Sequence, residues 1–112
     1  MAETVLVEES GGIRTLTLHR PEQRNALTPQ MQEELIAELR AAAGNAGCRA
    51  VVLTGAGETF CAGLDLRVAS RGEGKDAGGK SADDARRLAL LFRTLYECAK
   101  PTVAVVRGAA VA

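Results

Sequence analysis

Aromatic residues are scarce in this sequence. Its 112 residues include two phenylalanines, one tyrosine and no tryptophan. Aromatic side chains bury the largest apolar areas, so the core has to be built from smaller aliphatic side chains. An excess of one charge is missing too, because 14 basic residues balance 14 acidic ones. This balance argues against partners held by bulk positive charge, so we expect neither nucleic-acid nor membrane-surface binding.

Paired cysteines and long apolar runs are also missing. The three cysteines, Cys48, Cys61 and Cys98, are far apart and odd in number. They exclude a fully paired disulfide framework and a zinc knuckle, and we expect no metal site. The acidic N-terminus is unlike a signal peptide, and no segment approaches the ~20 apolar residues of a membrane span. These absences predict a cytoplasmic protein.

Strand-like and helix-like segments alternate along the chain. A Ser-Gly-Gly turn separates the first two strands and predicts a hairpin. The later strands are continuous apolar runs, which are typical of parallel strands covered on both faces. This alternation predicts an α/β layered domain. The predicted order is strand Thr4–Glu9, strand Ile13–His19, helix 29–43, strand Ala50–Thr54, flexible loop Ser70–Lys80, helix 81–100 and strand Thr102–Val106.

Both predicted helices have recognisable ends. Thr28 and Pro29 form a start, because the hydroxyl caps the first turn and proline needs no hydrogen-bond partner there. The second helix is predicted to start near Ser81, with Asp84 as an acidic variant of the capping box, and to end before Pro101. Each helix has one apolar face. The faces contain Met31, Leu35, Leu39 and Ala42 or Ala43 in the first helix, and Leu88, Leu91, Phe92, Leu95 and Ala99 in the second.

Residues Gly74–Ser81 match the phosphate-loop pattern G-x-x-x-x-G-K-[ST]. In such a loop, backbone N–H groups and the lysine hold phosphates while the hydroxyl holds magnesium. A buried strand should come directly before the motif, but the preceding residues are Val-Ala-Ser-Arg-Gly-Glu. We therefore favour a flexible polar loop with Ser81 as a helix cap, and a nucleotide-binding loop is a minor alternative.

The loop Gly55–Leu66 follows the predicted strand Ala50–Thr54, at the end where α/β sheets hold their ligands. If the chain turns into a helix near Asp65, the N–H groups of Gly63 and Leu64 are unpaired and can stabilise a developing oxyanion. The alternative is a plain strand-to-helix connection with Asp65 as its cap. The residues alone do not decide between the two.

Two single side chains near these segments have competing interpretations. Cys61 lies beside the possible anion site and could act as a thiolate nucleophile, but a small buried side chain is the favoured interpretation. His19 is the only histidine. Because no serine or aspartate is spaced to suggest a catalytic triad, we interpret it as a surface or packing residue.

Four segments together span nearly the whole chain: Arg20–Leu27, Ala50–Gly55, Phe60–Leu66 and Lys100–Gly108. In their order and spacing they resemble the enoyl-CoA hydratase/isomerase (crotonase) superfamily. The resemblance implies a β-β-α spiral, of which residues 1–112 would be the incomplete N-terminal portion of a single domain. It also implies homotrimers or hexamers that act on acyl-CoA thioesters, with coenzyme A as part of the substrate and no separate cofactor.

The same resemblance implies roles for individual residues. The backbone N–H of Leu64 would be the first of two donors that polarise the thioester carbonyl and stabilise the enolate. Arg24 would lie near the nucleotide end of coenzyme A, where its guanidinium can meet phosphate. Asn25 is interpreted as a turn former whose side chain ties its own backbone. The residues implied to bind coenzyme A are Arg24, Ala26, Ala62, Gly63, Leu64, Asp65 and Leu66.

The last segment that resembles the family ends at Gly108. Members continue into a glycine-rich turn that supplies the second donor, and their acid/base carboxylates come later still. Both would lie beyond Ala112, so we expect hydratase-type lyase or isomerase chemistry only with those parts, and almost no activity without them. The alternative is a non-catalytic truncated module that assembles with other subunits, favoured by the apolar residues near Ala112.

Overall fold

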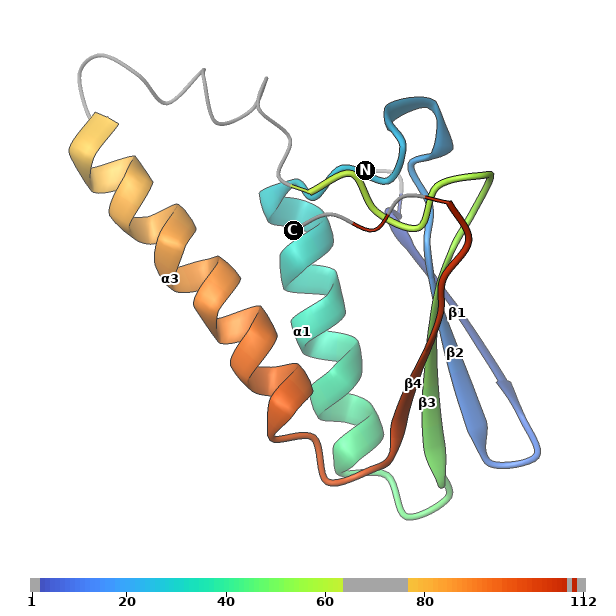
Figure 1. Ribbon diagram of the computed structural model, residues 1–112. Coiled ribbons are helices and arrows are strands. Elements are labelled where there is room, and N and C mark those ends of the chain that lie inside the picture. The colour runs from blue at the N-terminus through green and yellow to red at the C-terminus, as the bar shows by residue number, and fades with distance from the viewer. Residues whose placement is uncertain (1–2, 64–76, 109, 111–112) are drawn as a thin grey trace.

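The computed structural model describes residues 3–63, 77–108 and 110. One four-stranded sheet carries two helices on one side, and α1 lies between the sheet and α3 (Figure 1). The predicted α/β layering is therefore confirmed. Neither of the two described helices is long and apolar enough to cross a membrane. The elements are β1 (Val5–Ser10), β2 (Ile13–Leu18), the 3-10 turn η1 (Pro21–Gln23), α1 (Pro29–Ala43), β3 (Ala50–Gly55), α3 (Ala77–Tyr96) and β4 (Thr102–Val105).

The sheet has the strand order β1-β2-β3-β4. β1 and β2 form the predicted antiparallel hairpin, with Val5 opposite Leu18. β2, β3 and β4 are parallel neighbours. Parallel strands need a crossover between them, which α1 provides from β2 to β3 and α3 from β3 to β4. The carboxyl ends of all three strands therefore lie at the same end of the sheet, with Leu18 opposite Gly55 and Thr54 opposite Val105.

The core lies between the sheet and α1. Leu16 of β2 and Met31 of α1 are fully buried. The start of α1 is as predicted, because the Thr28 Oγ1 accepts a hydrogen bond from the Met31 N–H at 3.1 Å and Pro29 is the first helical residue. The predicted apolar face is confirmed too, since Met31, Leu35, Leu39 and Ala42 are all buried.

The helix α3 begins at Ala77, earlier than the predicted start near Ser81. Residues 77–80 of the expected flexible loop are therefore helical, and residues 70–76 lie outside the described residues. The glycines at 78 and 79 favour a loop, because glycine is about 1 kcal/mol less favourable than alanine inside a helix. Packing of the rest of the helix outweighs this preference. Leu91 is buried in the core, and Leu88 and Leu95 pack against it.

The strand β4 does not have the burial that its apolar sequence predicts. All four of its residues are exposed, and Val103 is 55% exposed. The strand is an edge of the described sheet and pairs with β3 alone. The prediction was wrong because an apolar run indicates a strand but not the elements that cover it. β3 agrees better with its prediction, since Val51 is buried and Leu53 packs against the core.

Candidate functional site

Two loops meet at the carboxyl ends of β2 and β3. The first loop, residues 19–28, follows β2, and the second loop, residues 56–63, follows β3. The predicted coenzyme A-binding residues within the described chain all lie here. Arg24 and Ala26 belong to the first loop, and Ala62 and Gly63 to the second, while Leu64, Asp65 and Leu66 lie outside the described residues.

Asn25 joins the first loop to the second. Its side chain is fully buried, with 0% exposure. Its Nδ2 donates to the carbonyl oxygens of Ala56, Thr59 and Phe60 at 2.9, 2.7 and 3.2 Å. Its Oδ1 accepts from the Arg20 N–H at 2.8 Å. The predicted role, in which the side chain ties its own turn, is therefore correct only for the bond to Arg20. A buried amide also needs partners for its two N–H bonds, and the carbonyls of the second loop provide them.

The backbone of the first loop is left-handed at two successive residues. Arg24 has a φ of +53° and Asn25 a φ of +56°. Such a conformation costs roughly 1–2 kcal/mol per residue outside glycine, so it persists only where other bonds hold it. The Arg24 N–H donates to the Pro21 carbonyl at 3.1 Å, and the Asn25 N–H donates to the Arg20 carbonyl at 2.8 Å. The turn directs Asn25 into the protein and leaves the Arg24 side chain exposed.

Two glycines allow the backbones to approach closely around the second loop. A Cβ on Gly55 would lie 2.6 Å from the Phe60 carbonyl oxygen and 2.9 Å from the Asn25 Nδ2. A Cβ on Gly108 would lie only 2.1 Å from the Glu58 carbonyl oxygen, and Gly108 also has a φ of +68°. The chain after β4 thus packs directly against the second loop.

The end of the second loop is held on two sides. The Leu27 N–H donates to the Gly63 carbonyl oxygen at 2.7 Å, which ties the loop to the start of α1. Cys61 forms an isolated parallel bridge with Ala110. The Gly63 N–H is 3.4 Å from the Cys61 Sγ, which serves as its acceptor. Residues 61–63 are therefore fixed between the first loop and the chain after β4.

Cys61 is a buried thiol. It is 6% exposed and belongs to the hydrophobic core. Burial raises the pKa of its thiol, and the hydrogen bond from the Gly63 N–H only partly opposes that effect. A raised pKa disfavours the thiolate, which is the nucleophilic form. The structure thus supports the interpretation of Cys61 as a small buried side chain.

An apolar cavity of about 220 Å³ opens beside Cys61. It lies between the ends of β2 and β3, the first turns of α1 and the last turns of α3. Its lining is aliphatic or aromatic apart from the thiol, so it suits an apolar group and offers no charge to a polar one. The lining residues are Leu18, Leu27, Leu35, Leu53, Phe60, Cys61, Leu91, Phe92, Leu95 and Ala110.

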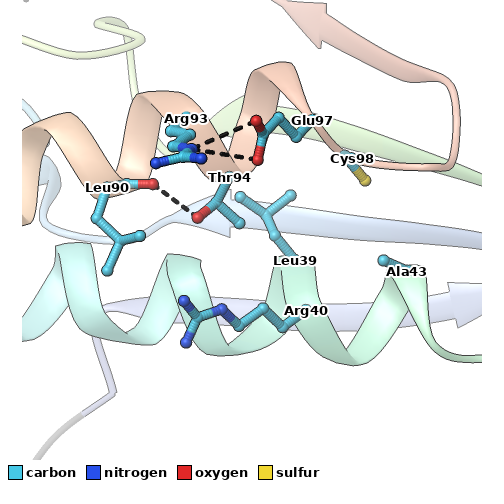
Figure 2. Close-up of a pocket in the computed structure, with 8 residues that line it drawn as sticks. All are labelled: Leu39, Arg40, Ala43, Leu90, Arg93, Thr94, Glu97 and Cys98. Carbon is cyan, nitrogen blue, oxygen red and sulfur yellow. Dashed lines mark hydrogen bonds and ion pairs between the residues drawn. The ribbon is translucent and has the colours of Figure 1, made fainter.

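A second cavity, of about 360 Å³, lies between α1 and α3 (Figure 2). Leu39, Arg40 and Ala43 line it from α1. Across from them, the Arg93 Nε is 3.3 Å from both carboxylate oxygens of Glu97. None of the predicted site residues lines this cavity.

Titratable side chains do not gather into a metal site in the part of the chain that the structure describes. There, no group of three or more histidine, cysteine, aspartate or glutamate residues could hold a metal ion. His19 is exposed, and its backbone N–H donates to the Thr4 carbonyl at 2.8 Å. This agrees with its interpretation as a surface residue.

The phosphate-loop match gains no support from the described residues. Its first three residues, 74–76, lie outside them. Residues 77–81 belong to α3, so this half of the motif is helical. A phosphate loop instead needs its glycines in a loop whose N–H groups converge on the phosphates. The helix therefore argues against nucleotide binding at this motif.

Comparison with known proteins shows which family the chain that carries these two loops belongs to. The profile of the enoyl-CoA hydratase/isomerase family matches residues 8–112. This chain belongs to that family. A Mycobacterium tuberculosis protein named "probable enoyl-CoA hydratase" is 38% identical over 111 residues, which are 97% of this chain and 41% of the relative. A Rhodobacter capsulatus protein of the same name is 42% identical over 109 residues, or 96% of this chain and 39% of the relative.

Solved structures of the family confirm the fold. The crystal structure of an enoyl-CoA hydratase from Polaromonas sp. JS666 matches with a TM-score of 0.87 and 35% identity, covering 95% of this chain and 41% of that one. The chain thus has the crotonase fold, of which it forms a portion. It spans about two fifths of the length of the curated relatives that it matches.

Sequence reasoning missed two contributors to the site. The first is the set of Asn25 bonds to the second loop, for which the only signal was the asparagine within Arg20–Leu27. The second is the Leu27 N–H that holds Gly63. A backbone N–H leaves no trace in a sequence, because every residue except proline has one.

Proposed function

We propose that this chain supplies the coenzyme A-binding loop and the first oxyanion donor of an enzyme that acts on acyl-CoA thioesters. The observation that carries the proposal is the joining of the two family segments at the carboxyl ends of β2 and β3. The Leu27 N–H holds Gly63 there at 2.7 Å. Family membership supports the substrate class.

The chemistry would be stabilisation of an enolate. The Leu64 N–H, next to Gly63, would donate to the thioester oxygen as negative charge develops on it. Removing one such donor typically slows acyl-transfer enzymes by about 10²–10³-fold. The second donor and the acid/base carboxylates would lie beyond Ala112, so residues 1–112 alone would be almost inactive in hydration or isomerisation.

The two loops offer groups for both ends of the thioester. Arg24 is exposed and its guanidinium can form charge-assisted hydrogen bonds with the phosphates of coenzyme A, near Ala26. Ala62 and Gly63 would run along the pantetheine arm, followed by Asp65 and Leu66. The apolar cavity beside Cys61 suits an aliphatic acyl group.

The test compares two thioesters that differ in their phosphates. Calorimetry would measure binding of butyryl-CoA and of butyryl-N-acetylcysteamine, which lacks the phosphates. Arg24→Ala should weaken butyryl-CoA binding about tenfold, since a hydrogen bond to a charged group contributes roughly 1.5–3 kcal/mol and 1.4 kcal/mol is tenfold. It should leave the shorter thioester unaffected.

The matched control is Arg40→Ala, because Arg40 lines the second cavity, between α1 and α3. It should change neither affinity. Equal losses for Arg24→Ala and Arg40→Ala, or equal losses for both thioesters, would contradict the assignment of Arg24 to the phosphates.

A non-catalytic assembly module is the second candidate, and exposed β4 favours it. Val103 and Val105 are 55% and 47% exposed on an edge strand. Exposed apolar edges are sites where other chains or segments pair. Light scattering tests this candidate: stable oligomers without thioester binding would favour it, and a monodisperse monomer would count against it.

A further inference from the structure

The cavity between α1 and α3 belongs to neither of the two loops. Its volume of about 360 Å³ falls within the range of roughly 300–1,000 Å³ that small-molecule sites occupy, whereas the cavity beside Cys61, at about 220 Å³, is smaller. The value lies near the lower limit of that range. A ligand held here would therefore be small, and it would be separate from the proposed thioester site.

The floor of this cavity is apolar. Leu39 of α1 is only 1% exposed, while Leu90 of α3 is 38% exposed. Figure 2 shows these two side chains extending from the facing helices into the space between them. Ala43 contributes no more than a methyl group from the next turn of α1. An alkyl chain on this floor would remove apolar surface of Leu90 from water, which favours binding.

The side chains around this floor carry one positive charge more than they carry negative charges. The Arg93 Nε is 3.3 Å from both carboxylate oxygens of Glu97, so these two charges offset each other. The Arg40 side chain is exposed, and it forms no hydrogen bond or ion pair within residues 3–63, 77–108 and 110. A guanidinium can hold a carboxylate by two parallel N–H···O bonds. Arg40 therefore favours an anionic group in the cavity.

The nearby end of α1 does not cancel this positive charge. A helix end carries partial negative charge on carbonyls that lack partners. Here the Arg40 carbonyl accepts from the Gly44 N–H at 3.1 Å, and the Ala42 carbonyl accepts from the Asn45 N–H at 3.2 Å. Figure 2 shows the Arg40 side chain extending back along α1, away from Ala43. The charge of the guanidinium therefore stays available to a ligand.

We propose that this cavity binds a small aliphatic carboxylate. The carboxylate would accept the N–H bonds of Arg40, and the alkyl chain would cover Leu39 and Leu90. Inorganic phosphate offers the charge without the chain, and a fatty alcohol offers the chain without the charge, so each satisfies only half of the site. The inference does not depend on the proposed function, because no residue of the two loops lines this cavity.

Octanoate is the probe that tests the proposal, used below the concentration at which it forms micelles. The backbone amide spectrum of the ¹⁵N-labelled chain should show saturable shifts at residues 39–43 and 90–98. Octanol should bind about tenfold more weakly, because it lacks the charge-assisted bonds to Arg40. Inorganic phosphate should shift these amides only at much higher concentration, because it leaves the leucines uncovered. No saturable shift with octanoate, or equal affinity for octanol, would overturn the proposal.

Two variants separate the two contacts. Arg40→Ala should weaken octanoate binding about tenfold and leave octanol binding unchanged. Leu90→Ala should weaken the binding of both ligands alike, because it removes apolar contact area. Butyryl-CoA carries no carboxylate on its acyl chain, so its binding should not depend on Arg40.

Arg86→Ala is the matched control. Arg86 is an exposed residue of the same helix α3, its Nη1 is 2.9 Å from the Asp83 Oδ1, and it does not line the cavity. Its replacement should leave octanoate binding unchanged. Equal losses for Arg40→Ala and Arg86→Ala would overturn the proposal, as would octanoate shifts confined to the cavity beside Cys61.

Discussion

Two regions of this protein, the pair of loops at the carboxyl ends of β2 and β3 and the edge strand β4, are supported very differently. At the carboxyl ends of β2 and β3, the two loops hold each other through the buried Asn25 amide and the Leu27–Gly63 bond. Along β4, by contrast, Val103 and Val105 are 55% and 47% exposed. The comparison teaches that the candidate binding loops are held by bonds to each other and by a contact from the chain after β4, whereas the valines of β4 stay exposed. The predictions below test that difference, from the largest expected effect to the smallest.

Removing the Asn25 side chain should be the most damaging change to stability. Asn25→Ala removes the partner that the buried amide offers to part-buried carbonyls of the second loop and to the Arg20 N–H, and each polar group left unsatisfied away from water costs roughly 1–3 kcal/mol. We expect the free energy of unfolding in urea to fall by about 3 kcal/mol or more. Asn45→Ala should cost less than about 1 kcal/mol, because its one bond is exposed. Similar losses for the two variants would mean that the loops do not depend on Asn25.

Gly108→Ala tests the contact of the chain after β4 with the second loop. The new Cβ would meet the Glu58 carbonyl oxygen, and the left-handed backbone adds roughly 1–2 kcal/mol of strain. Gly11→Ala separates the two effects, since Gly11 has a φ of +60° but open space around its Cβ position. Thermal unfolding should show a clearly larger loss for Gly108→Ala. Equal losses would indicate that the contact with Glu58 relaxes freely.

The other edge strand, β1, is an intermediate case, because Glu34 of α1 ties down its start. The Glu34 Oε1 accepts from the N–H and Oγ1 of Thr4 and from the Val5 N–H, at 2.8, 2.9 and 3.0 Å. Burial acts to raise the pKa of this carboxyl, but these bonds and one from Gln30 outweigh it and hold the pKa below its ordinary value of 4.5.

A lowered folded-state pKa sets the direction of the pH effect. The stability that ionised Glu34 contributes is present above the unfolded-state pKa and is lost as the pH falls through the folded-state pKa. The free energy of unfolding in urea should therefore fall for the wild type as the pH drops below about 4.5. Glu34→Gln should lose less of its free energy of unfolding over the same pH range. The same pH dependence in both proteins would rule out this role for Glu34.

Local signals in the sequence predicted the elements that local chemistry controls. Thr28, Pro29 and the spacing of Met31, Leu35 and Leu39 gave α1 its start and its buried face, and the Ser-Gly-Gly turn gave the hairpin its register. The family segments also placed Arg24, Ala26, Ala62 and Gly63 on two loops that the structure brings together, and their roles in binding coenzyme A stay predictions.

Tertiary contacts account for what the sequence did not reveal. The start of α3 depends on the packing of Leu91 and its neighbours, which outweighs two glycines. The exposure of β4 depends on which elements cover it, and its valines look the same in either case. The partners of Asn25 are backbone carbonyls more than 30 positions away, and no side-chain pattern marks them.

The most direct test of the proposed thioester site is a titration of the ¹⁵N-labelled chain with butyryl-CoA, followed by the backbone amide spectrum. The two loops at the carboxyl ends of β2 and β3 should respond, with the largest changes at residues 24–27 and 61–63. A response confined to residues 39–43 and 90–98, which border the cavity between α1 and α3 (Figure 2), would contradict the account, as would no response at all.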